Sequence, residues 1–152
     1  MLDKTSAFNA IDKELLPSVL DCLQNGFLVV LIGASGTGKS VLAEKALPNA
    51  KCVSFPYNQH DFFKLKESCS TDIIVEEVCL TRALDEAIQV RDLMLEKGNF
   101  IIFTGQVWQE VKPFLTGLSS NRYKVFDLNK IWYPYGLRTP DLEPIPSEVL
   151  AN

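Results

Sequence analysis

One short run of residues in this chain has the types and the spacing needed to hold a triphosphate. It fits the phosphate-loop pattern G-x-x-x-x-G-K-[ST] at every fixed position, and it consists of Gly33, Ala34, Ser35, Gly36, Thr37, Gly38, Lys39 and Ser40. The glycines let backbone N–H groups approach the phosphates closely, because no Cβ blocks the dihedral angles that this requires. Lys39, expected on a solvent-facing loop, can reach the β- and γ-phosphates, and the Ser40 hydroxyl can ligate Mg²⁺. The run predicts a nucleoside triphosphate site that extends to Val41.

The segments on either side of this loop suit a strand followed by a helix. Residues 27–32 (FLVVLI) form a continuous apolar run that is typical of a buried parallel strand. Residues 41–47 are expected to form a helix that Pro48 ends. The N-terminus of such a helix adds positive dipole beside the phosphates, so the context supports the motif.

Paired carboxylates end another apolar segment, residues 72–78 (DIIVEEV), which is expected to be a strand. A carboxylate at the C-terminal end of a strand beside the phosphate loop can serve Mg²⁺, usually through water. A second carboxylate next to it can orient and deprotonate an attacking water. We therefore expect Glu76 to act on the metal side and Glu77 to act as the general base.

Strand-like and helix-like segments alternate along the chain. Strands are expected at 27–32, 52–55, 72–78, 100–104 and 123–128, and helices at 10–25, 41–47, 61–67, 81–97 and 107–118. This alternation favours a parallel sheet with helices on both faces. Half of the prolines lie after residue 133. We therefore expect a single domain at 1–138 and a proline-rich irregular tail at 139–152, either wrapped on the domain or held by a partner.

Length and composition fit one globular domain. The chain has 152 residues, of which 47% are hydrophobic and 22% charged, and these values are ordinary for a soluble protein. No apolar stretch reaches the ~18 residues needed to span a bilayer, and the N-terminus lacks a signal-peptide pattern. The four cysteines form no C-x-x-C pair, so we expect reduced thiols in a cytoplasmic protein. A net charge of −4 argues against tight nucleic-acid binding through bulk electrostatics.

The phosphate loop and the acidic strand together resemble one division of the P-loop NTPases. In that division an additional strand separates the two motifs, and a catalytic glutamate follows the metal-binding acid; the AAA+ ATPases and the superfamily 3 helicases belong to it. The resemblance covers roughly residues 10–128 and implies a three-layer α/β domain with a parallel five-stranded sheet in the order 5-1-4-3-2. The usual acidic pair there is Asp-Glu, so the side chain of Glu76 is one methylene longer than the family pattern.

The same resemblance assigns roles to residues further along the chain. That division has a polar residue at the end of the next strand, where it positions the lytic water. Thr104 and Gln106 are the candidates, and the strand-end position favours Thr104. Arg122 precedes a strand, as does the arginine with which an AAA+ subunit reaches the γ-phosphate of its neighbour, so an arginine finger in trans and a homo-oligomer are implied. The helical lid of AAA+ proteins is expected to be absent or vestigial, with Arg138 as a candidate substitute for its arginine.

These observations predict Mg²⁺-dependent ATP binding and slow ATP hydrolysis. By resemblance, hydrolysis is coupled to a DNA or protein partner, as in a plasmid, phage or other mobile-element process. A GTPase is disfavoured because the segment 129–132 begins the guanine-reading motif N-K-x-D but has Trp132 in place of the aspartate.

Two alternatives stay open. A small-molecule or nucleotide kinase would have the same size and phosphate loop, although paired glutamates favour activation of water, and the four arginines of this chain are few for a kinase. A nucleotide-dependent assembly switch with negligible turnover is favoured by the aromatic residues Trp132, Tyr133 and Tyr135, which would mark a contact surface if they are exposed.

Overall fold

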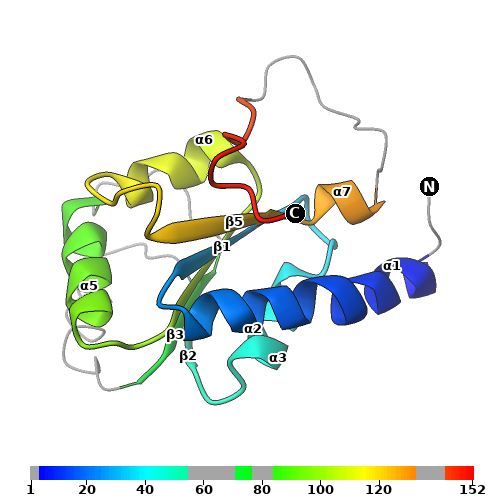
Figure 1. Cartoon of the computed structure of the whole chain (residues 1–152), viewed down its shortest axis with the longest axis horizontal. Coiled ribbons are helices and arrows are strands. Elements are labelled where there is room, and N and C mark those ends of the chain that lie inside the picture. The colour runs from blue at the N-terminus through cyan, green and yellow to red at the C-terminus, as the bar shows by residue number, and fades with distance from the viewer. Residues whose placement is uncertain (1–3, 55–70, 77–83, 133–142) are drawn as a thin grey trace.

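The computed structural model describes residues 4–54, 71–76, 84–132 and 143–152 (Figure 1). The expected helix at 61–67, the general-base candidate Glu77 and Arg138 lie outside these ranges. None of the described helices is both long and apolar enough to cross a lipid bilayer.

Within the described ranges, five parallel strands form one sheet in the order β2-β3-β4-β1-β5. They are β1 (Leu28–Ile32), β2 (Lys51–Ser54), β3 (Ile73–Glu76), β4 (Ile101–Gly105) and β5 (Tyr123–Asp127). Every residue of β1 is buried, as a strand covered on both faces requires. The parallel sheet and its strand order confirm the predicted α/β fold class.

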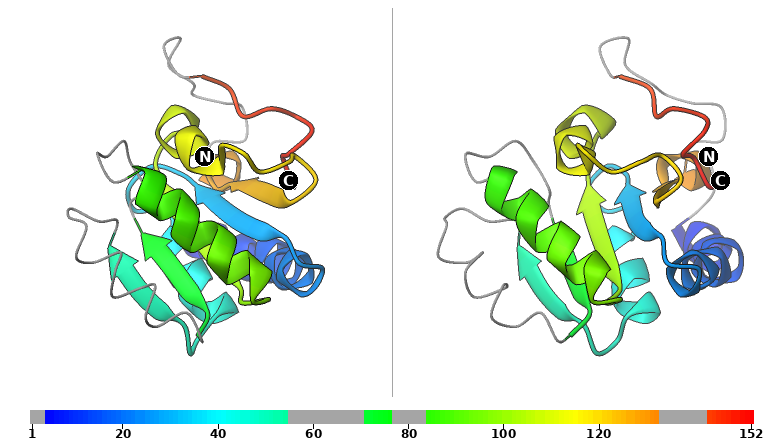
Figure 2. Two further views of the ribbon diagram at one scale, coloured as in Figure 1. Left: turned by 90° about the vertical axis from the view of Figure 1, so that its left-hand side faces the viewer. Right: turned by 60° about the vertical axis from the view of Figure 1, so that its left-hand side comes forward.

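Helices cover both faces of this sheet, as Figure 2 shows. One face carries a continuous helical run of α1 (Lys4–Ala10), a π-helical turn (Ile11–Leu15) and α2 (Leu16–Gln24), together with α3 (Lys39–Ala46). The other face carries α5 (Leu84–Glu96), α6 (Trp108–Val111) and a 3₁₀ turn (Lys112–Leu115). A further short helix, α7 (Asn129–Trp132), follows β5 and lies beside α1 (Figure 1).

Alternate residues of each strand supply two separate hydrophobic cores. Val29 of β1 packs in the core that includes Leu42 of α3. The next residue, Val30, packs in the opposite core with Met94 of α5. Because successive side chains of a strand point to opposite faces, the position of a residue in its strand decides which helical layer it faces.

Two helices differ from the sequence-based expectation. The opening helix, expected at 10–25, already begins at Lys4, because Ala7 extends its buried face and is 0% exposed. The helix expected at 107–118 is α-helical only to Val111 and continues as a 3₁₀ turn. Pro113 explains this break, since it lacks a backbone N–H and its ring clashes with the preceding turn of an α-helix.

The described part of the C-terminal segment, residues 143–152, lies against the domain (Figure 1). Val149 is 1% exposed, and Leu150 forms a parallel bridge with Val125 of β5. The Val125 N–H donates to the Val149 carbonyl at 2.9 Å, and the Ala151 N–H donates to the Val125 carbonyl at 2.8 Å. The segment thus satisfies backbone groups along the outer edge of β5, which would otherwise be an unpaired strand edge.

Candidate nucleotide-binding site

The glycine-rich loop lies at the carboxyl edge of the sheet. It joins the last residue of β1 to the first residue of α3, and its first N–H, that of Gly33, donates to the Gly105 carbonyl at the end of β4 at 3.1 Å. Gly38 is the N-cap of α3. The loop therefore combines two features that favour anions and ligands in α/β proteins, a helix N-terminus and the carboxyl ends of parallel strands.

The glycines of the loop are needed for two different reasons. Gly36 and Gly38 have φ angles of 82° and 95°, in the left-handed region that favours glycine. Gly33 has no such backbone, but a Cβ placed on it would lie 2.5 Å from Oγ1 of Thr37. The dihedral argument made from sequence thus holds for two of these glycines, whereas Gly33 is required by the close approach of a neighbouring side chain.

Lys39 is buried, with only 6% of its surface exposed. Its Nζ donates hydrogen bonds to the backbone carbonyl of Gly33 and, at 3.2 Å, to that of Ala34. The expectation of a solvent-facing lysine is therefore wrong. The side chain folds back across the loop because these carbonyl oxygens replace water around the ammonium group, which is the condition for burying a charged group.

A tight turn gives the loop its internal rigidity. Oγ1 of Thr37 donates to the Ala34 carbonyl at 2.8 Å, and the Thr37 N–H points to the same oxygen at 3.3 Å. Thr37 itself is buried at 5% exposure. The remaining residues predicted to contact nucleotide are on the outer side of the loop and the first turn of α3, where Ala34, Ser35, Gly36, Ser40 and Val41 are exposed.

Glu76 is the last residue of β3, and Thr104 is the next-to-last residue of the neighbouring β4, whose final residue, Gly105, bonds to the loop. The β3–β4 register pairs Val75 with Phe103, so the following residues, Glu76 and Thr104, come opposite each other at the carboxyl edge. Val75 and Phe103 belong to the core facing α5, and strand alternation therefore turns Glu76 and Thr104 toward the α3 layer. Thr104 is 1% exposed and pairs with Leu31 of β1, whereas Gln106 is exposed beyond the end of β4.

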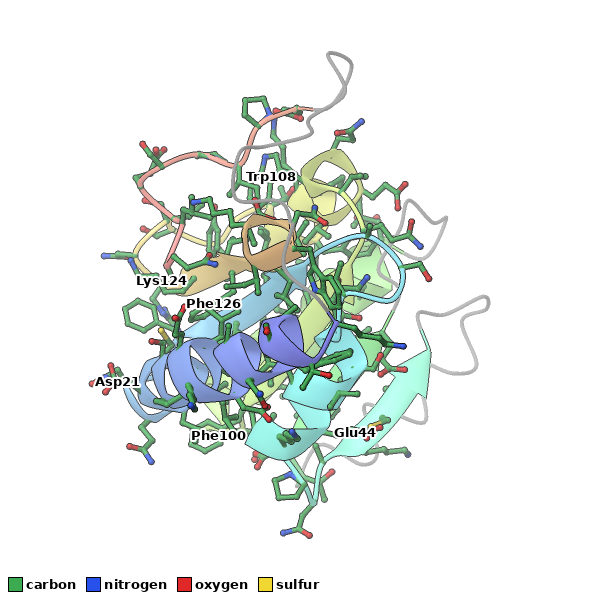
Figure 3. The ribbon with its side chains drawn as sticks, turned by 90° about the vertical axis from the view of Figure 1, so that its right-hand side faces the viewer. Asp21, Glu44, Phe100, Trp108, Lys124 and Phe126 are labelled. Carbon is green, nitrogen blue, oxygen red and sulfur yellow. The ribbon has the colours of Figure 1, made fainter. Side chains whose placement is uncertain are left out.

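The electrostatics of Cys52 agree with this orientation of Glu76. Cys52 is exposed. Local desolvation nevertheless raises the pKa of its thiol, and the carboxylates of Glu76 and then Glu44 raise it further. Glu44 belongs to α3 (Figure 3). Cys52 pairs with Ile74 of β3, whose side chain packs in the α3 core. Glu76 therefore places its negative charge on the same side of the sheet as the helix that follows the loop.

The residues near the loop suit Mg²⁺ only if the nucleotide and water complete its shell. Within the described ranges, no group of three or more His, Cys, Asp or Glu side chains could hold a metal ion by itself. Mg²⁺ usually keeps several waters and takes one or two carboxylates together with substrate phosphates. The carboxylate of Glu76 and the exposed hydroxyl of Ser40 are a donor set of this kind.

Arg122 lies at the amino-terminal ends of the strands, whereas the loop follows a carboxyl end. Its carbonyl accepts the N–H of Leu28, the first residue of β1, whereas the loop follows Ile32, the last residue of that strand. Leu28 and Ile32 are four residue steps apart, about 13 Å at ~3.3 Å per residue, which exceeds the reach of an arginine side chain. The structure therefore does not bring Arg122 to the loop of its own chain.

The short helix α7 contributes two contacts that sequence reasoning missed. Oδ1 of Asn129 accepts the Ala34 N–H at 3.0 Å, and Nε1 of Trp132 donates to the Thr37 carbonyl at 3.0 Å. The Phe8 ring of α1 packs edge-on against Trp132, with ring centroids 5.5 Å apart and an interplanar angle of 87°. The sequence feature that could have indicated these contacts is the spacing of Asn129 and Trp132, three positions apart just after β5.

Comparison with known proteins gives similarity of shape at low sequence identity. No protein-family model matches the chain, and no relative was found among the curated proteins. The structure of PCH-2 from C. elegans is similar at a TM-score of 0.49 and 13% identity, over 84% of this chain and 43% of that one. The Pif1 helicase from Candida albicans is similar at a TM-score of 0.47 and 16% identity, over 76% of this chain and 39% of that one. The chain thus spans less than half the length of either protein.

Proposed function

We propose that the chain binds ATP with Mg²⁺ at the loop and hydrolyses it slowly. The observation that carries this proposal is the position of Lys39, whose ammonium group is held by the Gly33 and Ala34 carbonyls at the N-terminus of α3. A lysine fixed in this way needs little reorganisation to meet a phosphate, because its side chain is ordered before the ligand arrives. The left-handed Gly36 and Gly38 allow the backbone of the same loop to come equally close.

The second half of the proposed site comes from β3 and β4. Ser40 and Glu76 would hold Mg²⁺, which when bound neutralises charge on the phosphate oxygens. Glu77 follows directly in sequence and is proposed as the general base that deprotonates the attacking water. Of the two candidates for positioning this water, the buried strand-end position of Thr104 favours it over the exposed Gln106.

A homo-oligomer is proposed on the family resemblance, which gives Arg122 the role of an arginine finger acting in trans. Since this arginine lies across the sheet from its own loop, it can approach the γ-phosphate only in another copy of the chain. Such an arginine would stabilise the charge that develops on the transferred phosphoryl group. Coupling of hydrolysis to a DNA or protein partner is proposed on the family resemblance.

The assembly-switch alternative relied on exposed aromatic residues that would form a contact surface, and Trp132 does not fit this description. Trp132 is only partly exposed, because its ring packs against Phe8 and its N–H bonds to the loop. It therefore completes the region of the loop and is not a free contact surface. Tyr133 and Tyr135 lie outside the described residues.

Titration calorimetry and a turnover assay together test the proposal. Purified protein with Mg²⁺ is expected to bind a non-hydrolysable ATP analogue and to release inorganic phosphate from ATP, with and without added DNA. Binding without any phosphate release would favour the switch. Nucleoside diphosphate formed without free phosphate, once a small-molecule or nucleotide acceptor is added to take the phosphoryl group, would favour a kinase. An absence of binding at millimolar analogue would contradict the proposed function as a whole.

A further inference from the structure

Trp132 controls the direction of one peptide group in the loop. Its indole N–H donates to the Thr37 carbonyl. The C=O and the N–H of a trans peptide point in opposite directions, and the described chain contains no cis peptide. The bond from Trp132 therefore turns the Gly38 N–H away from the indole. Gly38 is the N-cap of α3, so this N–H stands beside the first amides of the helix, which lack partners within the helix itself.

Asn129 controls a second peptide group by the same geometry. Its Oδ1 accepts the Ala34 N–H, so the other end of that peptide, the Gly33 carbonyl, must point the opposite way. This carbonyl is the one that accepts a hydrogen bond from Nζ of Lys39. Asn129 thus acts on the ammonium group indirectly, by fixing the carbonyl that holds it.

The backbone of Asn129 and the ring of Trp132 are themselves held in place. The N–H of Asn129 donates to Oδ1 of Asp127 at 3.0 Å. The edge-on contact with Phe8 fixes the Trp132 ring, and Phe8 also lies so close to the loop that a Cβ on Gly38 would meet its ring at 2.9 Å. The two residues therefore have the supported geometry that precise positioning of a site requires.

We propose that Asn129 and Trp132 are positioning residues of the nucleotide site. They orient the Gly33–Ala34 and Thr37–Gly38 peptides so that the Lys39 ammonium and the Gly38 N–H are both directed to the phosphates. This inference rests on the proposed nucleotide binding and extends it to a helix outside the glycine-rich motif. The expected effect is on affinity, because a loop that is ordered in advance loses less conformational freedom on binding.

Matched substitutions on α7 test the inference. Trp132→Phe keeps an aromatic ring against Phe8 but removes the donor, and Asn129→Leu keeps the side-chain size but removes the acceptor. Each loses one hydrogen bond to the loop and is expected to bind the ATP analogue about three- to tenfold more weakly, with a melting temperature near that of the wild type. Lys130→Gln is the control, since Lys130 lies on the same helix but bonds to the carbonyl of Asn152.

Fluorescence shows separately whether Trp132 senses the occupied loop. The chain has two tryptophans. Trp108 packs in the core on the α5 side of the sheet, whereas Trp132 bonds to the loop. In Trp108→Phe, the emission of Trp132 is expected to shift when the analogue and Mg²⁺ bind, because the carbonyl to which its indole donates belongs to the loop. In Trp132→Phe, the remaining Trp108 should show no such shift.

The outcomes separate this inference from the function on which it rests. If the wild type binds the analogue, both α7 variants bind it equally well and Trp132 emission stays constant, the positioning role is wrong and nucleotide binding stands. If the wild type fails to bind, the proposed function is wrong and the inference falls with it. Weaker binding in both variants, with unchanged binding in Lys130→Gln and a Trp132 signal, supports the role.

Discussion

The side-chain amide of Asn152 forms hydrogen bonds with both the backbone N–H and the backbone carbonyl of Asp127 in β5. Its Oδ1 accepts the Asp127 N–H at 2.8 Å, and its Nδ2 donates to the Asp127 carbonyl at 3.0 Å. The amide group thereby makes the two bonds that a neighbouring strand would make at the edge of the sheet. Since Asp127 also accepts the N–H of Asn129, the C-terminal segment is linked through α7 to the phosphate loop.

Asn152→Ala is expected to lower the free energy of unfolding by about 1–2 kcal/mol, because it leaves two backbone groups of Asp127 without their partners. Chemical denaturation monitored by circular dichroism measures this change. Ser147→Ala, an exposed position in the same segment, is the control and should leave stability unchanged. Equal stability of Asn152→Ala and the wild type would mean that water replaces the amide at no cost.

Lys39→Met is expected to weaken binding of the ATP analogue by about ten- to hundredfold, the loss typical of charged hydrogen bonds. Methionine retains the buried stem, so the melting temperature should stay close to that of the wild type. Lys45→Met is the matched control, because Lys45 lies on the same helix but forms an exposed ion pair with Asp12 at 2.8 Å. Titration calorimetry measures the affinity of the wild type and the two variants for the ATP analogue. Equal affinities would mean that Lys39 does not contribute to nucleotide binding.

Glu77→Gln is expected to keep ATP binding and to slow hydrolysis by about a hundredfold, since an amide of the same shape cannot accept the proton of the attacking water. Glu76→Gln should instead raise the Mg²⁺ concentration needed for half-maximal turnover. Phosphate release measured across a Mg²⁺ titration distinguishes the two effects. Exchanged phenotypes would mean that the metal-side residue and the base have been assigned in reverse.

Cys52 reports on the charge of Glu76. The Glu76 carboxylate raises the pKa of this thiol, so Glu76→Gln should lower that pKa and increase the thiolate fraction at a given pH. The alkylation rate against pH, measured in a protein whose other cysteines are serine, should therefore have its midpoint at lower pH. Glu44→Gln should cause a smaller shift in the same direction, because its carboxylate has the lesser effect. An unmoved midpoint in Glu76→Gln would contradict the orientation of Glu76 toward the α3 layer.

Local sequence patterns predicted the parts of the fold that depend on local physics. The apolar, β-branched run before Gly33 favoured a buried strand, and the alternation of strand-like and helix-like segments favoured a parallel sheet. The order of the strands came from the resemblance of the phosphate loop and the acidic strand to a known division. Two helix ends differ from the prediction. The opening helix begins earlier and buries Ala7, and the helix after β4 ends before Pro113.

The missed features depend on contacts between distant parts of the chain. Trp132 and Thr37 are separated by 95 positions, so nothing near the motif indicates that an indole holds its carbonyl. The need for glycine at position 33 follows from where the Thr37 hydroxyl lies in space. Lys39 was expected to face solvent because the loop was expected to, and only the positions of two loop carbonyls explain why its side chain is buried.

Arg122→Ala tests whether two copies of the chain share a catalytic site. Arg122 lies at the edge of the sheet opposite its own loop, so a catalytic role requires a second subunit. The specific activity of the wild type should then rise with protein concentration as subunits associate. The Arg122→Ala protein should lose this rise and still bind nucleotide, because its own loop is intact.

Mixing two inactive variants makes this test specific. Arg122→Ala supplies an intact loop and Lys39→Met supplies an intact arginine, so a mixture should recover part of the turnover that neither protein shows alone. Phosphate release is measured at a fixed total concentration while the ratio of the two variants is changed. A wild-type rate per subunit that stays constant from nanomolar to high micromolar protein, with Arg122→Ala equally active, would exclude the shared site. The kinase and the assembly switch would then be the better descriptions, because neither requires an arginine from a second copy.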